Sequence, residues 1–169
     1  MNYTVVKYPE KVLERPTEPV TRFDDDLARL TDEMFVCMYA AHGVGLAAPQ
    51  IGLSQRLAVV DVTSGQDPAK KIVLCNPEII ATSGKQTMEE GCLSLPGIRA
   101  PVWRPERAAV RAQNLHGEWF EMEGEELLAR AFCHETDHLN GRLFLSHMSI
   151  LRRDVVKRRI RRMIKAGEW

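Results

Sequence analysis

Three stretches of the chain carry apolar residues at helical spacing. The first begins at Asp24–Asp26, which supply an N-cap and an acidic first turn, and its pattern ends at Gly43. The second runs from Gly124 to about Asn140-Gly141. A third begins near Ser149 and places apolar residues opposite basic ones, at Val155, Val156, Ile160, Met163 and Ile164. We therefore predict three helices, the last of them at the C-terminal end.

Between the first two helical patterns the residues follow β-like patterns. Some segments are rich in Val, Leu and Ile, and others alternate apolar with charged residues: Arg56–Val62, Lys71–Leu74, Ile79–Thr82, Ala108–Ala112 and Glu118–Met122. Gly and Pro punctuate them, as at Asn76-Pro77 and Leu95-Pro96-Gly97. Because the strands do not alternate with helices as βαβ units do, the order indicates an α+β fold with an antiparallel-leaning sheet.

The composition is that of one globular domain. The chain has 169 residues, of which 44% are hydrophobic and 27% charged, and no repeat or Gly/Ser-rich linker divides it. Its 23 basic residues balance 23 acidic ones, so total charge gives no argument for binding nucleic acid. We expect a single catalytic domain over residues 1–169, with residues 148–169 forming a basic helical tail.

The charges are unevenly distributed. Residues 150–169 contain eight Lys or Arg and two acidic residues, so the tail has a net charge of +6 and the rest of the chain −6. A basic helix of this kind suits a polyanionic partner, but it is equally compatible with a solvated helix face. The N-terminal residues do not resemble a signal peptide, and the four cysteines are widely spaced, so we expect reduced thiols and a cytoplasmic location.

The sequence His134-Glu135-Thr136-Asp137-His138 is an H-E-x-x-H motif within a helical pattern. Residues four apart lie on one face of a helix, so both imidazoles can reach one metal ion. Glu135 would lie near enough to accept a proton from a metal-bound water. Catalytic sites of this type usually have three protein ligands and one open position, so a third ligand is required.

The third ligand distinguishes the classes of H-E-x-x-H protein. Metzincins place a third histidine at the position that Phe144 occupies, and the only acidic residues after His138 are Asp154 and Glu168, in the basic tail. Upstream, Cys92 stands in the turn-prone segment Glu90–Pro96, and a thiolate with two imidazoles would leave one position open. We interpret Cys37, Cys75 and Cys133 as packing residues.

The segment Gly43–Gln50 is rich in small residues. Its glycine spacing imitates a dinucleotide-binding loop, but a helix precedes it, where that motif requires a strand. Small residues ending in an amide side chain instead suit close approach to an extended peptide, and Gln50 could donate to a developing oxyanion.

Together, Gly43–Gln50, Glu90–Ser94 and His134–His138 resemble, in order and spacing, the three motifs of the bacterial peptide deformylases. The resemblance extends from about Tyr8 to the tail. It implies an α+β fold in which antiparallel-leaning mixed sheets pack around a central metal-binding helix, with a further C-terminal helix. It also implies an enzyme that removes the N-formyl group from the formylmethionine of nascent polypeptides and releases formate.

The resemblance also implies roles for individual residues. Cys92, His134 and His138 would bind the metal, Glu135 would act as general acid and base, and Gln50 with the Leu93 backbone N–H would hold the oxyanion. Substrate contacts would come from Val44, Gly45, Met88, Glu90, Gly91, Leu127 and Ala131. Two positions depart from the family pattern: Cys133 stands where Gln is common, and Arg130 stands where an apolar residue of the pocket rim is common.

The resemblance further implies one divalent metal ion, Fe²⁺ in the cell, which Zn²⁺, Ni²⁺ or Co²⁺ could replace. It implies ribosome binding through the basic helix, and no membrane or nucleotide cofactor. Two alternatives remain open from the residues alone. One is a peptidase that cuts internal bonds. The other is a non-enzymatic, metal-stabilised ribosome-binding protein, which needs a fourth ligand such as His42, His116 or His147.

Overall fold

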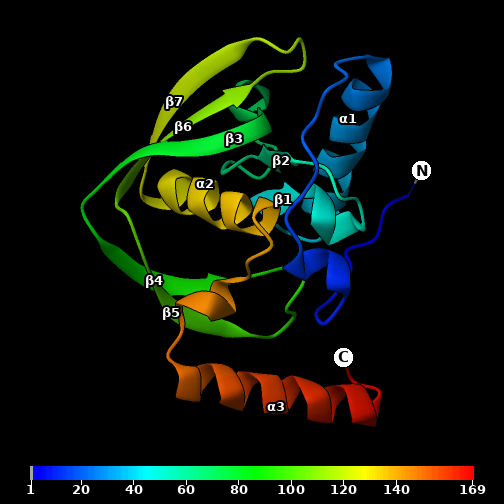
Figure 1. The fold of residues 1–169 in the computed structure, drawn as a ribbon, viewed down its shortest axis with the longest axis vertical. Coiled ribbons are helices and arrows are strands. Elements are labelled where there is room, and N and C mark those ends of the chain that lie inside the picture. The colour runs from blue at the N-terminus through cyan, green and yellow to red at the C-terminus, as the bar shows by residue number, and fades with distance from the viewer. Residues whose placement is uncertain (1) are drawn as a thin grey trace.

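Two antiparallel sheets and three α-helices form the fold of residues 2–169, which the computed structural model describes (Figure 1). The helices are α1 (Asp25–Ala40), α2 (Glu126–Leu139) and α3 (Ile150–Ala166). One sheet has the order β1-β2-β3-β6-β7, from Gly45–Ala47, Leu57–Val60, Ile72–Ser83, Arg107–Gln113 and Trp119–Glu125. The second pairs β4 with β5, Gln86–Gly91 and Arg99–Arg104. The α+β expectation is confirmed, since every pairing of these strands is antiparallel.

Helix α2 lies between the five-stranded sheet and the β4–β5 hairpin (Figure 1). Its buried residues Ala131, Phe132 and Leu139 pack in one apolar cluster with residues of β2, β3 and β6. Ten of its 14 residues are buried, so the polar residues among them must find partners inside the protein. Helix α1 begins where expected: the Asp24 carboxylate accepts the Leu27 backbone N–H at 3.1 Å.

Four short 3₁₀ segments connect these elements, at Lys11–Glu14, Ala48–Ile51, Pro68–Lys70 and Phe144–His147. Beside the second of them, the backbone of the buried residue Asp61 supports the Gly43–Gln50 segment. Asp61, at the end of β2, donates its backbone N–H to the Val44 carbonyl at 2.9 Å. Its carboxylate accepts hydrogen bonds from Thr63, Gly65 and the Tyr39 hydroxyl.

The expected break at Asn76-Pro77 is wrong, because β3 continues through it. The strand accommodates the proline through shifts of register between Cys75 and Glu78 and a positive φ of 52° at Asn76. The Asn76 side chain then binds both backbone groups of Val20, at 2.8 and 2.9 Å. An irregular strand here therefore fixes the chain before α1.

The strands β4 and β5 were not predicted from the sequence. The hairpin is a separate two-stranded sheet, and in β4 only Glu90 is buried. A strand with one buried residue, itself charged, has no apolar alternation to detect.

The predicted apolar face of α3 is only partly correct. Ile160 is fully buried, whereas Val155 and Ile164 are 63% and 43% exposed. The helix lies across the end of the molecule beside the β4–β5 hairpin (Figure 1). Ile160 packs in an apolar cluster with Leu13 and Leu95, and the Trp169 indole N–H donates to the Tyr8 carbonyl at 2.6 Å. The tail is therefore part of the packed structure.

The N-terminal segment contacts two of the sequence motifs and the end of α2. Its backbone N–H groups donate from Val6 to the Gln50 carbonyl at 2.7 Å and from Tyr8 to the Ser94 carbonyl at 2.9 Å. Further on, the Thr17 N–H donates to the carbonyl of Leu139, at the end of α2. This segment thus ties together stretches of chain that are far apart in sequence. No helix among residues 2–169 combines the length and apolarity needed to cross a bilayer.

Candidate metal centre

Three potential ligand atoms converge at the buried side of α2. Cys92 follows β4, and its Sγ lies 3.3 Å from the His138 Nε2. The Nε2 atoms of His134 and His138 lie 3.1 Å apart. All three ligand atoms lie within 4.8 Å of one another. Among residues 2–169, no other group of three or more His, Cys, Asp or Glu side chains converges in this way, and His42, His116 and His147 do not join this one.

The spacing of these atoms fits a tetrahedral ion. With metal–nitrogen bonds of about 2.0–2.1 Å and a metal–sulfur bond of about 2.3 Å, tetrahedral ligands lie roughly 3.4 Å (N to N) and 3.6 Å (S to N) apart. The observed 3.1 and 3.3 Å are close to these values. A thiolate and two imidazoles are also the donor types that zinc and the later first-row metals accept. The residues therefore fit a divalent metal with one position left open.

Glu135 lies beside these ligands on α2. Its side chain is almost fully buried, and its Oε2 has no hydrogen-bond partner within the protein. Burial raises the pKa of Glu135 to about 7. A carboxyl group with a pKa near neutrality can both accept and return a proton.

The absence of a side chain at Gly45 makes room for this carboxyl group. A Cβ atom built at Gly45 would lie 2.9 Å from the Glu135 Cδ and 3.0 Å from its Cγ. Strand β1 therefore approaches Glu135 more closely than any residue but glycine allows.

Gln50 has a fixed amide orientation. Its Oε1 accepts the Ala47 backbone N–H at 3.0 Å, so its Nε2 points the other way. There the Nε2 lies 3.3 Å from the Ser94 Oγ and 3.6 Å from the Cys92 Sγ. The amide donor therefore lies beside the candidate ligands, as does Leu93, which follows Cys92 and lines the same cavity.

Glu90 holds the ring of His134. Its Oε2 lies 2.8 Å from the His134 Nδ1, which leaves the Nε2 to face the candidate metal position. Two guanidinium groups also bind this buried carboxylate, Arg104 through Nε and Nη2 and Arg130 through Nη1. Burial alone would raise the pKa of Glu90, but the bonds from His134 and Arg104 outweigh it and hold that pKa well below its usual range.

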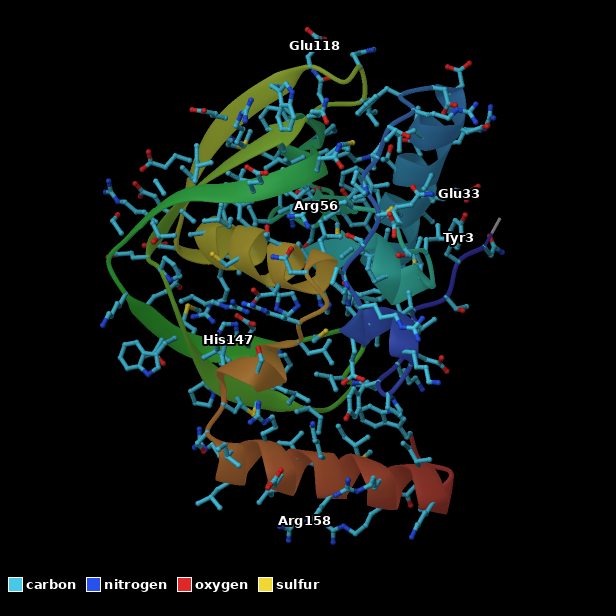
Figure 2. All side chains as sticks on the ribbon, in the orientation of Figure 1. Tyr3, Glu33, Arg56, Glu118, His147 and Arg158 are labelled. Atoms are coloured by element: carbon cyan, nitrogen blue, oxygen red, sulfur yellow. The ribbon has the colours of Figure 1, made fainter. Side chains whose placement is uncertain are left out.

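The Glu90 network continues to the surface. Arg104 Nη1 donates to the Asp137 Oδ2 at 2.7 Å. The same oxygen lies 2.8 Å from the Nε2 of His147, in the 3₁₀ segment that precedes α3 (Figure 2). The positive charges of Arg104 and Arg130 thus balance the negative charges of Glu90 and Asp137 around α2. Arg104 was not identified from the sequence, because the strand that carries it was not predicted. Asp137 lies inside the H-E-x-x-H motif, which could have indicated it.

A cavity of about 660 Å³ opens beside Cys92, His134 and Glu135. Of the residues expected to contact substrate, six line it: Val44, Gly45, Glu90, Gly91, Leu127 and Ala131. Met88 is not among the lining residues, and its side chain is half exposed on β4. Arg130 also lines the cavity, although it is only 5% exposed. The Glu90 carboxylate draws its guanidinium group inward.

The other cysteines are free thiols without a place in this cluster. Cys75 is fully buried, Cys37 is half-buried, and Cys133 is 9% exposed on α2. Burial raises the pKa of Cys133 to about 11, so the thiol is neutral at physiological pH. Cys133 packs with Ala108 and Ala129, as expected of a small apolar residue.

Comparison with known proteins relates this fold and site to one family. The family model described as polypeptide deformylase matches residues 2–154. The chain is 61% identical over 165 residues to a peptide deformylase of Acidobacterium capsulatum, which covers 98% of this chain and 97% of that protein. A peptide deformylase crystal structure from Legionella pneumophila superposes with a TM-score of 0.90 at 41% identity, covering 99% of this chain and 98% of the other. A plant peptide deformylase structure superposes with a TM-score of 0.90 at 38% identity.

Proposed function

The chain belongs to the polypeptide deformylase family, and we propose that Cys92, His134 and His138 bind the metal with which this enzyme works. The enzyme hydrolyses the formyl amide of formylmethionine at the N-terminus of nascent polypeptides, and it is a metalloenzyme. The convergence of one thiol from the turn after β4 and two imidazoles from α2 carries the assignment of the ligands. Because the chain belongs to this family, we set aside the alternative of a peptidase that cuts internal peptide bonds.

Glu135 is the proposed proton carrier. The chemistry that a bound divalent ion supplies is Lewis acidity toward water and the formyl oxygen. Glu135 accepts the proton of the attacking water and then delivers it to the leaving amine. Its burial and its unpartnered Oε2 support both roles, because no other protein group competes for that oxygen.

Gln50 and the backbone N–H of Leu93 are the proposed donors to the tetrahedral oxyanion. The Ala47 N–H fixes the Gln50 Oε1, so the Nε2 is oriented toward the site before substrate binds. A hydrogen-bond donor that is already oriented stabilises the transition state more than one that must first be oriented. Ser94, whose role was not predicted, helps to hold the same amide.

The peptide is proposed to lie in the cavity beside these groups. Gly45 and Gly91 border it with backbone that side chains do not cover, which suits hydrogen bonds to an extended peptide. Leu127, Ala131 and Val44 supply apolar surface for the methionine side chain. Met88 does not line this cavity and is half exposed, so it is proposed to contact a peptide residue other than the methionine.

Formate release from formyl-Met-Ala-Ser by anaerobically purified protein tests the assignment, with metal content measured on the same sample. We expect one metal ion per chain and formate release that chelation abolishes and metal restores. A Cys92→Ala variant should lose both metal and activity, whereas Cys133→Ala should keep both. If Cys92→Ala bound metal as the wild type does, the proposed ligand set would be wrong.

Iron is the proposed metal in the cell. Thiolate and imidazole donors accept Fe²⁺, Zn²⁺, Ni²⁺ and Co²⁺, so availability decides which of them is bound. Protein purified without oxygen should contain Fe²⁺ and lose activity in air, and reconstitution with Ni²⁺ or Co²⁺ should give air-stable activity. Unchanged activity after oxygen exposure of the iron form would contradict this choice.

We further propose that the chain is one catalytic domain over residues 1–169, that it works in the cytoplasm, and that its tail, residues 148–169, contacts the ribosome. Arg158 points away from the body of the molecule (Figure 2), and Arg162 and Lys165 are exposed on the same helix. A polyanionic ribosomal surface would attract this charge in a salt-dependent way.

Charge reversal tests the ribosome contact better than deletion, because α3 buries Ile160 and anchors Trp169. Replacing Arg158, Arg162 and Lys165 by Glu should weaken ribosome binding and reduce its salt dependence, while leaving hydrolysis of formyl-Met-Ala-Ser unchanged. Reversing three exposed basic residues elsewhere is the charge-matched control: Arg22, Arg29 and Lys70. Equal loss of binding in both variants would refute a specific role for the tail.

A further inference from the structure

The chain passes from β7 into α2 without a connecting residue. Strand β7 ends at Glu125 and α2 begins at Glu126, so the change of direction is concentrated there. Glu126 has a φ of 52°, in the left-handed region that residues other than glycine adopt only at a steric cost. The side chain of the N-cap residue Glu125 makes no capping hydrogen bond, unlike Asp24 at α1 and Ser149 at α3. The start of α2 therefore depends on contacts with other parts of the chain.

Both backbone groups of Glu126 are bound by other segments. Its N–H donates to the carbonyl of Glu106, in the turn between β5 and β6, at 2.9 Å. Its carbonyl accepts a hydrogen bond from the Gln86 Nε2 at 2.8 Å. The same Nε2 donates to the Pro105 carbonyl, also at 2.8 Å. The amide of Gln86 thus joins the first residue of β4 to the turn after β5 and to the first residue of α2. These bonds hold Glu126 in its strained conformation.

This junction connects two walls of the cavity beside the candidate metal site. The β4–β5 hairpin supplies residues 89–91 to the lining, and α2 supplies Leu127, which follows Glu126 directly. The hairpin is a sheet of its own, on the other side of α2 from the five-stranded sheet (Figure 1). Its distance from α2 is therefore set by side-chain contacts. Glu90 makes such contacts beside the metal site, and Gln86 makes one at the start of α2.

We propose that Gln86 is a positioning residue for methionine specificity, because its bond to the Glu126 carbonyl holds Leu127 where the cavity wall meets the substrate side chain. This inference rests on the proposed function, in which the cavity holds the methionine and Leu127 supplies apolar surface. Without the Gln86 donor, the Glu126 backbone relaxes out of the left-handed region and displaces the residue that follows it. Gln86 itself does not line the cavity, so it acts through Leu127 and does not touch the substrate.

The test compares formyl-Met-Ala-Ser with formyl-Ala-Ala-Ser on the full-length, metal-loaded enzyme. Gln86→Met keeps the length of the side chain but removes both N–H donors. We expect kcat/KM for the methionine peptide to fall about 3- to 10-fold relative to the alanine peptide, the effect of one ordinary hydrogen bond. The loss should appear in KM with kcat unchanged, because the apolar contact to the substrate is made equally in the ground state and the transition state.

Glu126→Gly supplies a rescue that a general loss of stability would not show. Glycine adopts a positive φ without a steric cost, so the chain keeps its path into α2 even when Gln86 is replaced. The double variant should therefore regain the wild-type preference for methionine. Gln113→Met is the matched control, since this amide accepts from the Asn76 Nδ2 at 2.7 Å and donates to the Gly117 carbonyl at 2.9 Å without lining the cavity. The control should lose stability but keep the preference.

A Gln86→Met enzyme with the wild-type preference would overturn the proposal and leave the proposed function standing. A double variant with no more preference than Gln86→Met would also overturn it, since the loss would not arise from the conformation of Glu126. Hydrolysis of neither peptide by the metal-loaded wild type would instead contradict the proposed site, and this inference with it. If Gln86→Met did not fold, Gln86→Asn, whose shorter side chain cannot bind both carbonyls, would take its place with the same expected results.

Discussion

Replacing Gly45 by Ala should displace the proton carrier without touching the metal ligands. The added Cβ would lie 2.9 Å from the Glu135 Cδ and 3.0 Å from its Cγ, where ordinary contacts are 3.4 Å or more. Glu135 is only 3% exposed, so surrounding atoms limit how far its carboxyl group can turn away from the added methyl group. Relief of the overlap therefore requires the carboxyl group, or the β1 backbone, to move by at least about 0.5 Å.

The size of the effect follows from that displacement. A misplacement of about 1 Å in a reacting group can cost on the order of 10²-fold in rate. Such a loss is about 2.7 kcal/mol of transition-state stabilisation. The three atoms nearest to the added methyl group all belong to Glu135 and none to Cys92, His134 or His138, so metal affinity should remain that of the wild type.

The assay measures formate release and metal content on the same preparations. For Gly45→Ala we expect full metal occupancy and a kcat lowered about 10²-fold. Gly167→Ala is the control for stability, since it strains a left-handed residue at the end of α3, where φ is 71°, far from the site. That variant should lose stability but keep kcat. A Gly45→Ala enzyme with wild-type kcat, or with a raised KM as its only change, would refute the claim that Gly45 makes room for Glu135.

Three further predictions concern single side chains. Glu135→Gln should keep the metal and lower kcat by on the order of 10²–10⁴, and wild-type turnover in that variant would contradict the proton-carrier role. Gln50→Ala should lower kcat by on the order of 10²–10³ with KM little changed, which unchanged formate release would disprove. At Asp61, burial raises the carboxyl pKa, but hydrogen bonds from Thr63, Tyr39 and Gly65 outweigh it and lower that pKa overall. The stabilising effect of Asp61 is therefore complete above the unfolded pKa of about 3.9 and is lost as pH falls through the lower folded value. Asp61→Asn should reduce the free energy of unfolding at pH 7 by about 1–3 kcal/mol. This gap between the wild type and the variant should close in acid. Denaturant unfolding of both proteins at several pH values checks this, and a gap that widened in acid would contradict it.

The helices could be predicted because their signals are local. Asp24 caps α1, Ser149 caps α3 with its Oγ 3.3 Å from the Arg152 N–H, and the apolar spacing between caps follows the helical period. The β4–β5 hairpin could not be predicted in this way, since Glu90 is the only buried residue of β4. The reason Glu90 is buried lies in Arg104 and Arg130, 14 and 40 residues away, and no local pattern contains that information.

The candidate site divides in the same way. The two histidines and Glu135 follow from one helical turn, so their proximity was predictable from spacing alone. Cys92 lies 46 residues from His138, and its place beside the helix depends on the paths of the N-terminal segment and β4. The inward turn of Arg130 could not be foreseen, because an arginine on a cavity-facing helix position would normally extend toward water.

The ligand set can be read directly by X-ray absorption spectroscopy of the iron- or zinc-loaded protein. We predict one sulfur neighbour at about 2.3 Å, two imidazole nitrogens at about 2.0–2.1 Å, and one further light-atom neighbour that exchanges when formate or an inhibitor binds. In a Cys92→Ser variant the sulfur shell should disappear. A spectrum without sulfur, or one with a fourth protein ligand that no small molecule displaces, would contradict the proposed metal centre.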